Sequence, residues 1–208
     1  MNEETKSSVE LTSLKINLDK GLSVEIEDIH VTRVPGDGNG LYHALALAAN
    51  ECGIPPPVGA DLEQGWTHLA MRVLLTTYMN RCLESETWKT KLALTYEELD
   101  EQVRPLYDRD TTMEGYGELR NTIAFACYFG LTVYVLCDNV PIVVLKNCLR
   151  SGTELTCDAP KSQNQVDESV FIKFHDVGNG HYDYISKSDE LQADRLDTLT
   201  KMVHAIGK

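Results

Sequence analysis

A run of turn-forming residues between a β-rich segment and an apolar segment constrains the fold most. Residues 29–34 are rich in β-branched side chains, and residues 35–39 read Pro-Gly-Asp-Gly-Asn. Residues 41–50 carry apolar side chains suited to a helix. This order predicts a strand, a tight turn and a helix that begins at Gly40.

Position 40 therefore lies where a catalytic thiol would be activated. A helix N-terminus favours a thiolate, and backbone N–H groups of the preceding turn can stabilise an oxyanion. Gly40 has neither sulfur nor side chain, so this chain cannot carry out nucleophilic catalysis from that position. A glycine-rich turn that only joins a strand to a helix is the alternative interpretation.

A second segment places a base beside a residue that can orient it. Residues 170–175 and 181–185 have the composition of two strands, joined by the turn Asp176-Val177-Gly178-Asn179-Gly180. Residues i and i+2 of a strand share a face, so Asp183 is expected beside His181, where its carboxylate would fix the imidazole tautomer. The pair fits a general base and its orienter.

A third segment, residues 114–119, reads Glu-Gly-Tyr-Gly-Glu-Leu and precedes a helix expected over 120–129 and a strand expected over 131–136. Taken in order, the three segments resemble the ovarian-tumour (OTU) family of cysteine proteases. In that family Gly-Asp-Gly-Asn precedes the catalytic cysteine, a Trp/Tyr-Gly turn starts a later helix, and the base histidine is followed two residues on by Asp or Asn. The resemblance covers roughly residues 29–186.

The resemblance implies an α/β (α+β) chain with a papain-like OTU fold, in which helices flank a central mixed sheet. We expect an N-terminal extension over residues 1–28, a catalytic domain over residues 29–188 and a C-terminal helix over residues 189–208.

The activity that the resemblance implies is deubiquitination, the hydrolysis of the isopeptide bond after the last glycine of ubiquitin. It requires cysteine in place of Gly40, His181 as base, Asp183 as its orienter, and Asp37 in the turn. The oxyanion would be held by backbone N–H groups of Asp37, Gly38 and Asn39. A narrow channel for the ubiquitin tail would be lined by Gly115, Tyr116, Gly117, Glu118, Gly180 and Tyr182.

Gly40 departs from the family pattern and allows two interpretations. Either the chain is a natural ubiquitin-binding pseudoenzyme, or glycine was introduced to trap ubiquitin without turnover. Because Asp37, His181 and Asp183 are all present, we favour the engineered form. A cysteine hydrolase for another ubiquitin-like modifier or for a viral polyprotein is a further alternative.

The charge balance limits the partners. The chain has 32 Asp and Glu against 19 Lys and Arg, a net charge of −13, which argues against binding to nucleic-acid phosphates. Ubiquitin, with basic residues around its binding patch and in its tail, would be attracted to an acidic surface. We expect a monomer without membrane segments, cytoplasmic or in a host's cytosol if it is a viral or effector protein.

The cysteines predict neither disulfides nor a zinc site. Six are present, and none forms a Cys-x-x-Cys pair. We therefore expect free, mostly buried thiols and no metal or organic cofactor. They are Cys52, Cys82, Cys127, Cys137, Cys148 and Cys157.

Two further helices are expected over residues 64–83 and 96–107, the second strongly charged. The first would bury Leu69, Val73, Leu74, Tyr78 and Cys82. Near its start, Trp66 and His68 are expected to have packing roles. His43 is expected either on the surface of the helix over residues 41–50 or in support of the catalytic residues without contacting substrate.

Overall fold

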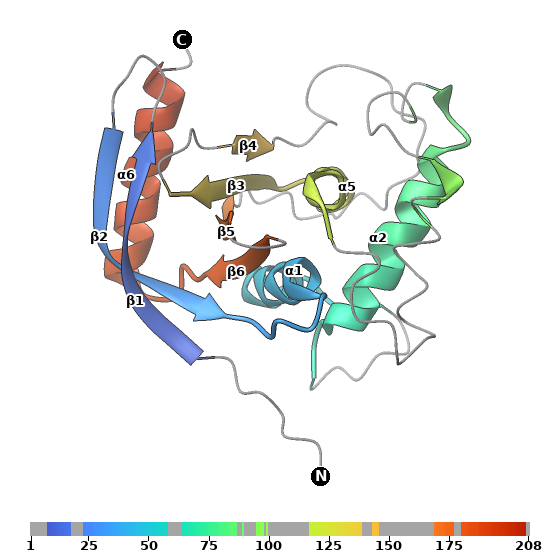
Figure 1. Ribbon diagram of the computed structural model, residues 1–208, viewed down its shortest axis with the longest axis horizontal. Helices are drawn as coiled ribbons and strands as arrows, with labels where there is room; N and C mark the ends of the chain where they lie inside the picture. Colours follow the sequence, from blue (N-terminus) through green and yellow to red (C-terminus); the bar gives the residue numbers. More distant parts are fainter. Residues whose placement is uncertain are drawn as a thin grey trace.

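The computed structural model describes residues 8–17, 23–57, 64–86, 89, 95–97, 99, 117–138, 143–145, 169–176 and 180–206. These residues form six strands and four helices (Figure 1). The strands are β1 (Ser8–Asn17), β2 (Ser23–Arg33), β3 (Thr132–Cys137), β4 (Val143–Leu145), β5 (Ser169–His175) and β6 (His181–Ile185). The helices are α1 (Gly40–Glu51), α2 (His68–Cys82), α5 (Leu119–Phe129) and α6 (Glu190–Ile206).

The strands form one mixed sheet in the order β1-β2-β6-β5-β3-β4. Strands β3 and β5 run parallel, whereas the remaining neighbours are antiparallel. The expectation of a mixed sheet with helices around it is confirmed. Because β6 pairs with both β2 and β5, the strand that carries His181 lies in the middle of the sheet.

Alternating side chains of the central strands face two separate hydrophobic cores. In β3, Val133 and Val135 contact one core, while Tyr134 and Leu136 contact the other. The same alternation continues in β5, where Val170 and Ile172 face one side and Phe171 the other. A strand buried on both faces needs this near-continuous apolar sequence.

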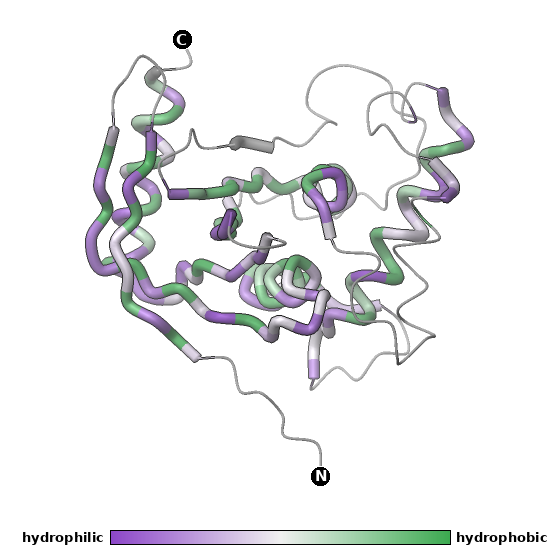
Figure 2. Tube along the Cα trace, viewed as in Figure 1, coloured by the Kyte–Doolittle hydropathy of each residue, from purple (hydrophilic) through white to green (hydrophobic). Residues whose placement is uncertain are grey.

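Helices cover both faces of the sheet. The larger core contains residues of α1, α2 and α5, and the smaller core contains β1, β2 and Leu196 and Leu199 of α6. In Figure 1, α1, α2 and α5 accordingly lie away from α6. Hydrophobic and hydrophilic residues alternate along β1 and β2 (Figure 2), consistent with strands that face the core on one side only.

The helix expected over residues 64–83 is shorter than predicted, and it buries a different face. It begins at His68, because the Thr67 side chain accepts the N–H of Ala70 and caps the helix at that point. Leu69 and Val73, predicted to be buried, are each 48% exposed. The buried face instead includes Met71, Arg72, Leu75, Thr76, Tyr78, Met79 and Cys82.

Strand β2 runs continuously through position 28, so the expected N-terminal extension and the first strand of the expected catalytic domain belong to one sheet. Cys82 and Cys127 are buried and Cys52 and Cys137 half-buried, all four as free thiols. Cys148, Cys157 and most of the helix expected over residues 96–107 lie outside the described residues. Among the described helices, none has the length and apolar character needed to span a membrane.

Candidate active site

Gly40 is the first residue of α1 and follows the predicted turn. Asn39 occupies the N-cap, and its carbonyl accepts the N–H of His43 in the first helical turn. Any side chain at position 40 would start from the N-terminal end of the helix, where the peptide dipoles favour negative charge.

His181 lies directly beside Gly40. A Cβ atom built on Gly40 would be 3.0 Å from both Nδ1 and Cε1 of the His181 ring. The opposite ring nitrogen, Nε2, lies 3.0 Å from Oδ1 of Asp183. When Nε2 carries the proton and donates to Asp183, the Nδ1 lone pair is left on the side of position 40, as a general base at that position requires.

Asp183 is fully buried at 0% exposure and is held by several donors. Its Oδ1 accepts the Val34 N–H at 3.0 Å as well as His181, and its Oδ2 lies 2.9 Å from Nε2 of His175. Burial raises the pKa of Asp183, but the hydrogen bonds from His175, His181 and Val34 outweigh it, and the net pKa is below the usual range. Asp183 therefore stays an anion beside the imidazole.

His175 is a site residue that the sequence analysis missed. It is the residue of β5 paired with His181 of β6, so both imidazoles reach the same carboxylate from adjacent strands. The sequence shows only that His175 is the last residue of a predicted strand. Only the register of the two strands reveals that it meets Asp183.

The turn before α1 is organised by Asp37. Its Oδ1 accepts the N–H of Asn39 at 2.8 Å, and its Oδ2 lies 3.1 Å from Nε2 of His43. Burial raises the pKa of Asp37, but the bonds from His43 and Asn39 outweigh it and lower the pKa to about 2. In this conformation the Asp37 side chain accepts the N–H of Asn39, so that N–H would have to be released before it could hold an oxyanion. The N–H groups of Asp37 and Gly38, the other two predicted donors, need no such release of the Asp37 side chain.

Arg72 of α2 also holds this turn. It is 1% exposed, its Nη1 donates to Oδ1 of Asn39, and its guanidinium lies 4.8 Å from the centre of the Tyr42 ring. The buried arginine therefore links the start of α1 to α2.

Two of the predicted channel residues, Gly117 and Glu118, lie just before α5 and close to α1. Gly117 approaches α1 so closely that a Cβ atom there would be 2.7 Å from Leu41. Glu118 is the N-cap of α5 and takes part in a capping box with Asn121, whose side chain also donates to the Tyr42 hydroxyl at 3.0 Å. This buried amide fixes Gly117 and Glu118 relative to α1.

The other predicted channel residues divide between described and undescribed parts of the chain. Gly180 precedes β6 with a φ of +79°, and a Cβ there would be 2.9 Å from the Phe174 ring. The Tyr182 ring lies 4.9 Å from that of Phe174, and burial raises the pKa of Tyr182 to about 12. Gly115 and Tyr116 lie outside the described residues.

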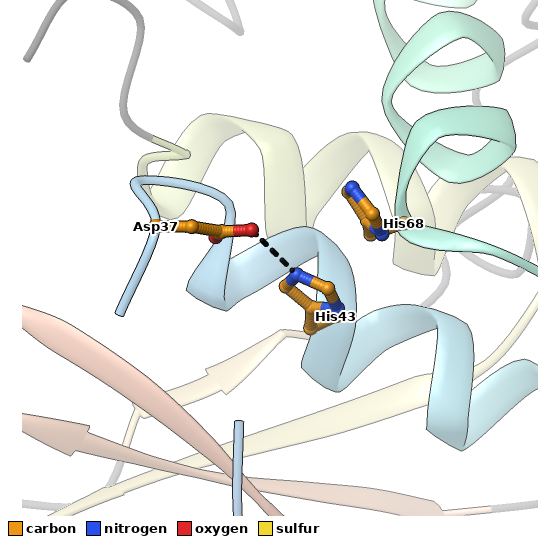
Figure 3. Close-up of side chains that lie close together, drawn as sticks. All are labelled: Asp37, His43 and His68. Carbon is orange, nitrogen blue, oxygen red and sulfur yellow. Dashed lines mark hydrogen bonds and ion pairs between the residues drawn. The ribbon is translucent and has the colours of Figure 1, made fainter. Parts of the chain in front are cut away.

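Behind the turn, Asp37 is joined by two histidines (Figure 3). His43 on α1 and His68 at the start of α2 have ring centroids 3.9 Å apart. Burial and the neighbouring His43 lower the pKa of His68, Asp37 opposes them, and the net pKa is about 4. Trp66, expected to have a packing role, is 5% exposed, and its indole donates to the carbonyl of Ile54.

Comparison with known proteins shows a similarity in structure. No protein-family profile matches the chain, and a search of curated proteins found no match. Among solved structures, it is similar to the viral OTU domain protease from Taggert virus, with 14% sequence identity and a TM-score of 0.46. The alignment covers 89% of this chain and 97% of that one.

Proposed function

We propose that the chain has the architecture of an OTU-type cysteine deubiquitinase whose nucleophile position is occupied by Gly40. In this form it binds ubiquitin or polyubiquitin without cleaving it. The observation that carries the proposal is the convergence of position 40, His181 and Asp183. Residues 141 positions apart in sequence bring a helix N-terminus into contact with a base, and that base is hydrogen-bonded to its orienting carboxylate.

With cysteine at position 40, the geometry supports a complete acyl-transfer cycle. His181 Nδ1 would accept the thiol proton, and the thiolate would attack the carbonyl carbon of the isopeptide bond. N–H groups of Asp37 and Gly38 would stabilise the tetrahedral oxyanion. As the C–N bond breaks, the imidazolium would return its proton to the leaving lysine amine.

The second half of the cycle uses the same residues. His181 would remove a proton from water as the water attacks the thioester, and would return that proton to the departing thiolate. Asp183 stays charged throughout and stabilises the imidazolium formed in each half. Gly40 removes only the attacking atom, so the rest of the site can still receive the ubiquitin tail.

The net negative charge of the chain supports ubiquitin as the partner. A net charge of −13 would accelerate association with a basic partner, at rates that fall as salt is added. The chain with glycine at position 40 is proposed to bind ubiquitin whether that glycine is natural or engineered.

The test is to compare the chain with its Gly40→Cys variant, using a ubiquitin C-terminal electrophile and linkage-defined diubiquitins. We expect the variant to be labelled and to cleave, and the unmodified chain to bind ubiquitin without either reaction. Gly40→Cys combined with His181→Ala should lose cleavage, whereas Gly40→Cys with His204→Ala, on the exposed end of α6, should keep it.

Failure of a folded Gly40→Cys variant to label or cleave would reject the hydrolase architecture. If ubiquitin still bound to both forms, the chain would be a recognition module. If neither form bound ubiquitin but Gly40→Cys was labelled by the electrophile of another modifier, the substrate would be that modifier.

A further inference from the structure

Asp37, His43 and His68 form a cluster of side chains that could bind a metal, located where the turn before α1 meets the start of α2. One ligand atom from each residue lies within 4.8 Å of the other two (Figure 3). The residues come from three places: the turn itself, the first turn of α1 and the first turn of α2. The three side chains are separate from the His181–Asp183 pair and take no part in the proposed hydrolysis, in which Asp37 contributes only its backbone N–H.

Two of the three ligands are already spaced as a metal site requires. Tetrahedral zinc with bonds of about 2.0–2.1 Å places its ligand atoms about 3.3 Å apart. His43 Nε2 and Asp37 Oδ2 are 3.1 Å apart, and each approaches from a helix or turn whose backbone is fixed by hydrogen bonds. A metal between them would replace the bond that now joins them.

His68 can supply the third ligand by a small movement of its side chain. Its ring lies over the ring of His43, and it has no hydrogen-bond partner within the part of the chain that the structure describes. A ring nitrogen of His68 is therefore available, and coordination needs a shift of roughly 1.5 Å at most to reach tetrahedral spacing.

The types of ligand atom in the cluster favour zinc over magnesium and calcium. Magnesium and calcium need several oxygen ligands, whereas the cluster contributes one carboxylate, that of Asp37. Two imidazoles and one carboxylate instead match zinc, which binds nitrogen strongly and accepts three protein ligands with one open position.

We propose that Asp37, His43 and His68 bind one Zn²⁺ ion and thereby tie the turn before α1 to the start of α2. The same Asp37 carboxylate accepts the Asn39 N–H, so an ion on its other oxygen would hold the turn in the observed conformation. Zinc would thus control how readily the N–H of Asn39 is released, independently of whether position 40 is glycine or cysteine.

The test uses tag-free protein as it stands, with Co²⁺ as a spectroscopic substitute and Zn²⁺ as competitor. We expect one equivalent of Co²⁺ to give the visible absorption of a four-coordinate site and to be displaced by Zn²⁺. The spectrum should lack a thiolate-to-cobalt charge-transfer band, which separates this cluster from the cysteines. Zn²⁺ should also raise the unfolding temperature.

Variants locate the ion. His68→Ala and Asp37→Asn should each weaken binding by at least about tenfold, since even groups that only orient ligands are worth about ten- to hundredfold in affinity. His204→Ala and His30→Ala, at exposed histidines elsewhere, should bind as the parent does. Circular dichroism would confirm that each variant is folded. Absence of Co²⁺ binding, a thiolate band, or full affinity in His68→Ala would each overturn the proposal.

Discussion

His175 and His181 lie opposite one another in the antiparallel ladder of β5 and β6, and their Nε2 atoms bond to different oxygens of one buried carboxylate. The carboxylate of Asp183 is thereby fixed from both sides. Without His175, Oδ2 of Asp183 would lose the partner that the structure gives it, and the carboxylate would be held through Oδ1. The shared arrangement makes His175 a positioning residue for His181 in the proposed function.

The effect of replacing His175 should therefore depend on whether the new side chain can still donate a hydrogen bond to Asp183. His175→Ala leaves Oδ2 of Asp183 without its partner and should lower the free energy of unfolding by about 1–3 kcal/mol. His175→Gln keeps an N–H donor of similar reach and should lose less. Urea unfolding measures both, with His204→Ala as a surface control expected within about 0.5 kcal/mol.

The catalytic readout requires the Gly40→Cys background. There, His175→Ala should lower kcat with little change in KM, because the tail-binding surfaces are untouched, and His175→Gln should recover part of the loss. Equal kinetics for Gly40→Cys with and without His175→Ala would show that His175 only fills space.

Asp183 should make the fold sensitive to acid. Its pKa is lower in the folded chain than in the unfolded chain, where an aspartate titrates near about 3.9. The stabilisation is complete above that pH, and it is lost as the pH falls toward the folded-state pKa, because the unfolded chain takes up the proton first.

Unfolding of the parent and of Asp183→Asn at pH 6 and pH 3 tests this sign. At pH 6 the variant should be less stable by about 1.5–3 kcal/mol, since it loses charge-assisted hydrogen bonds. At pH 3 the difference should narrow. Asp37, with a pKa of about 2, loses part of its own contribution over the same range in both proteins, so the comparison between them isolates Asp183. A gap that widened toward pH 3 would contradict the assignment.

The sequence predicted those parts of the site that depend on local signals. A proline-glycine turn between β-branched and apolar segments determines where β2 ends and α1 begins, and the two-residue strand period places Asp183 beside His181. These relationships need no knowledge of distant contacts, since each lies within a few residues of chain.

The parts that were missed depend on packing between elements. Helix α2 has apolar residues on two faces at helical spacing, and the sequence cannot tell which one meets α1. The structure buries the face with Arg72, whose charge is met by Asn39 and the Tyr42 ring, and leaves Val73 half exposed. His175 and the Asp37–His43–His68 cluster were missed for the same reason, because their partners come from other elements.

The close approach of Gly117 to α1 gives a prediction with a matched control. A methyl group at position 117 would be 2.7 Å from Cβ and Cδ2 of Leu41, which is 2% exposed and cannot move outward. Gly117→Ala should lower the free energy of unfolding by about 1–3 kcal/mol. Gly36→Ala, where nothing lies within 4 Å, should be neutral or stabilising by up to about 1 kcal/mol. Equal stability of the two variants would show that α1 and the segment at Gly117 are less closely packed.

Position 40 itself should tolerate a small side chain but not a branched one. A Cβ atom would meet the His181 ring at 3.0 Å and the Tyr182 carbonyl at 3.4 Å, and the His181 side chain is 29% exposed, so its ring can shift by a few tenths of an ångström. This strain opposes the gain of up to about 1 kcal/mol that alanine has over glycine in a helix. We therefore expect Gly40→Ala and Gly40→Cys within about 1 kcal/mol of the parent, and Gly40→Val less stable by about 1–3 kcal/mol.

Urea unfolding of the three variants, with the His181 ring signals followed by NMR, would test this prediction. Tolerance of alanine and cysteine with a displaced His181 signal would show that the turn and helix still have the form of a nucleophile site. Loss of several kcal/mol in Gly40→Ala would show instead that the fold now requires glycine at this position. Such a requirement would favour the natural pseudoenzyme over an engineered replacement, because a single introduced glycine leaves the surrounding structure suited to the residue it replaced.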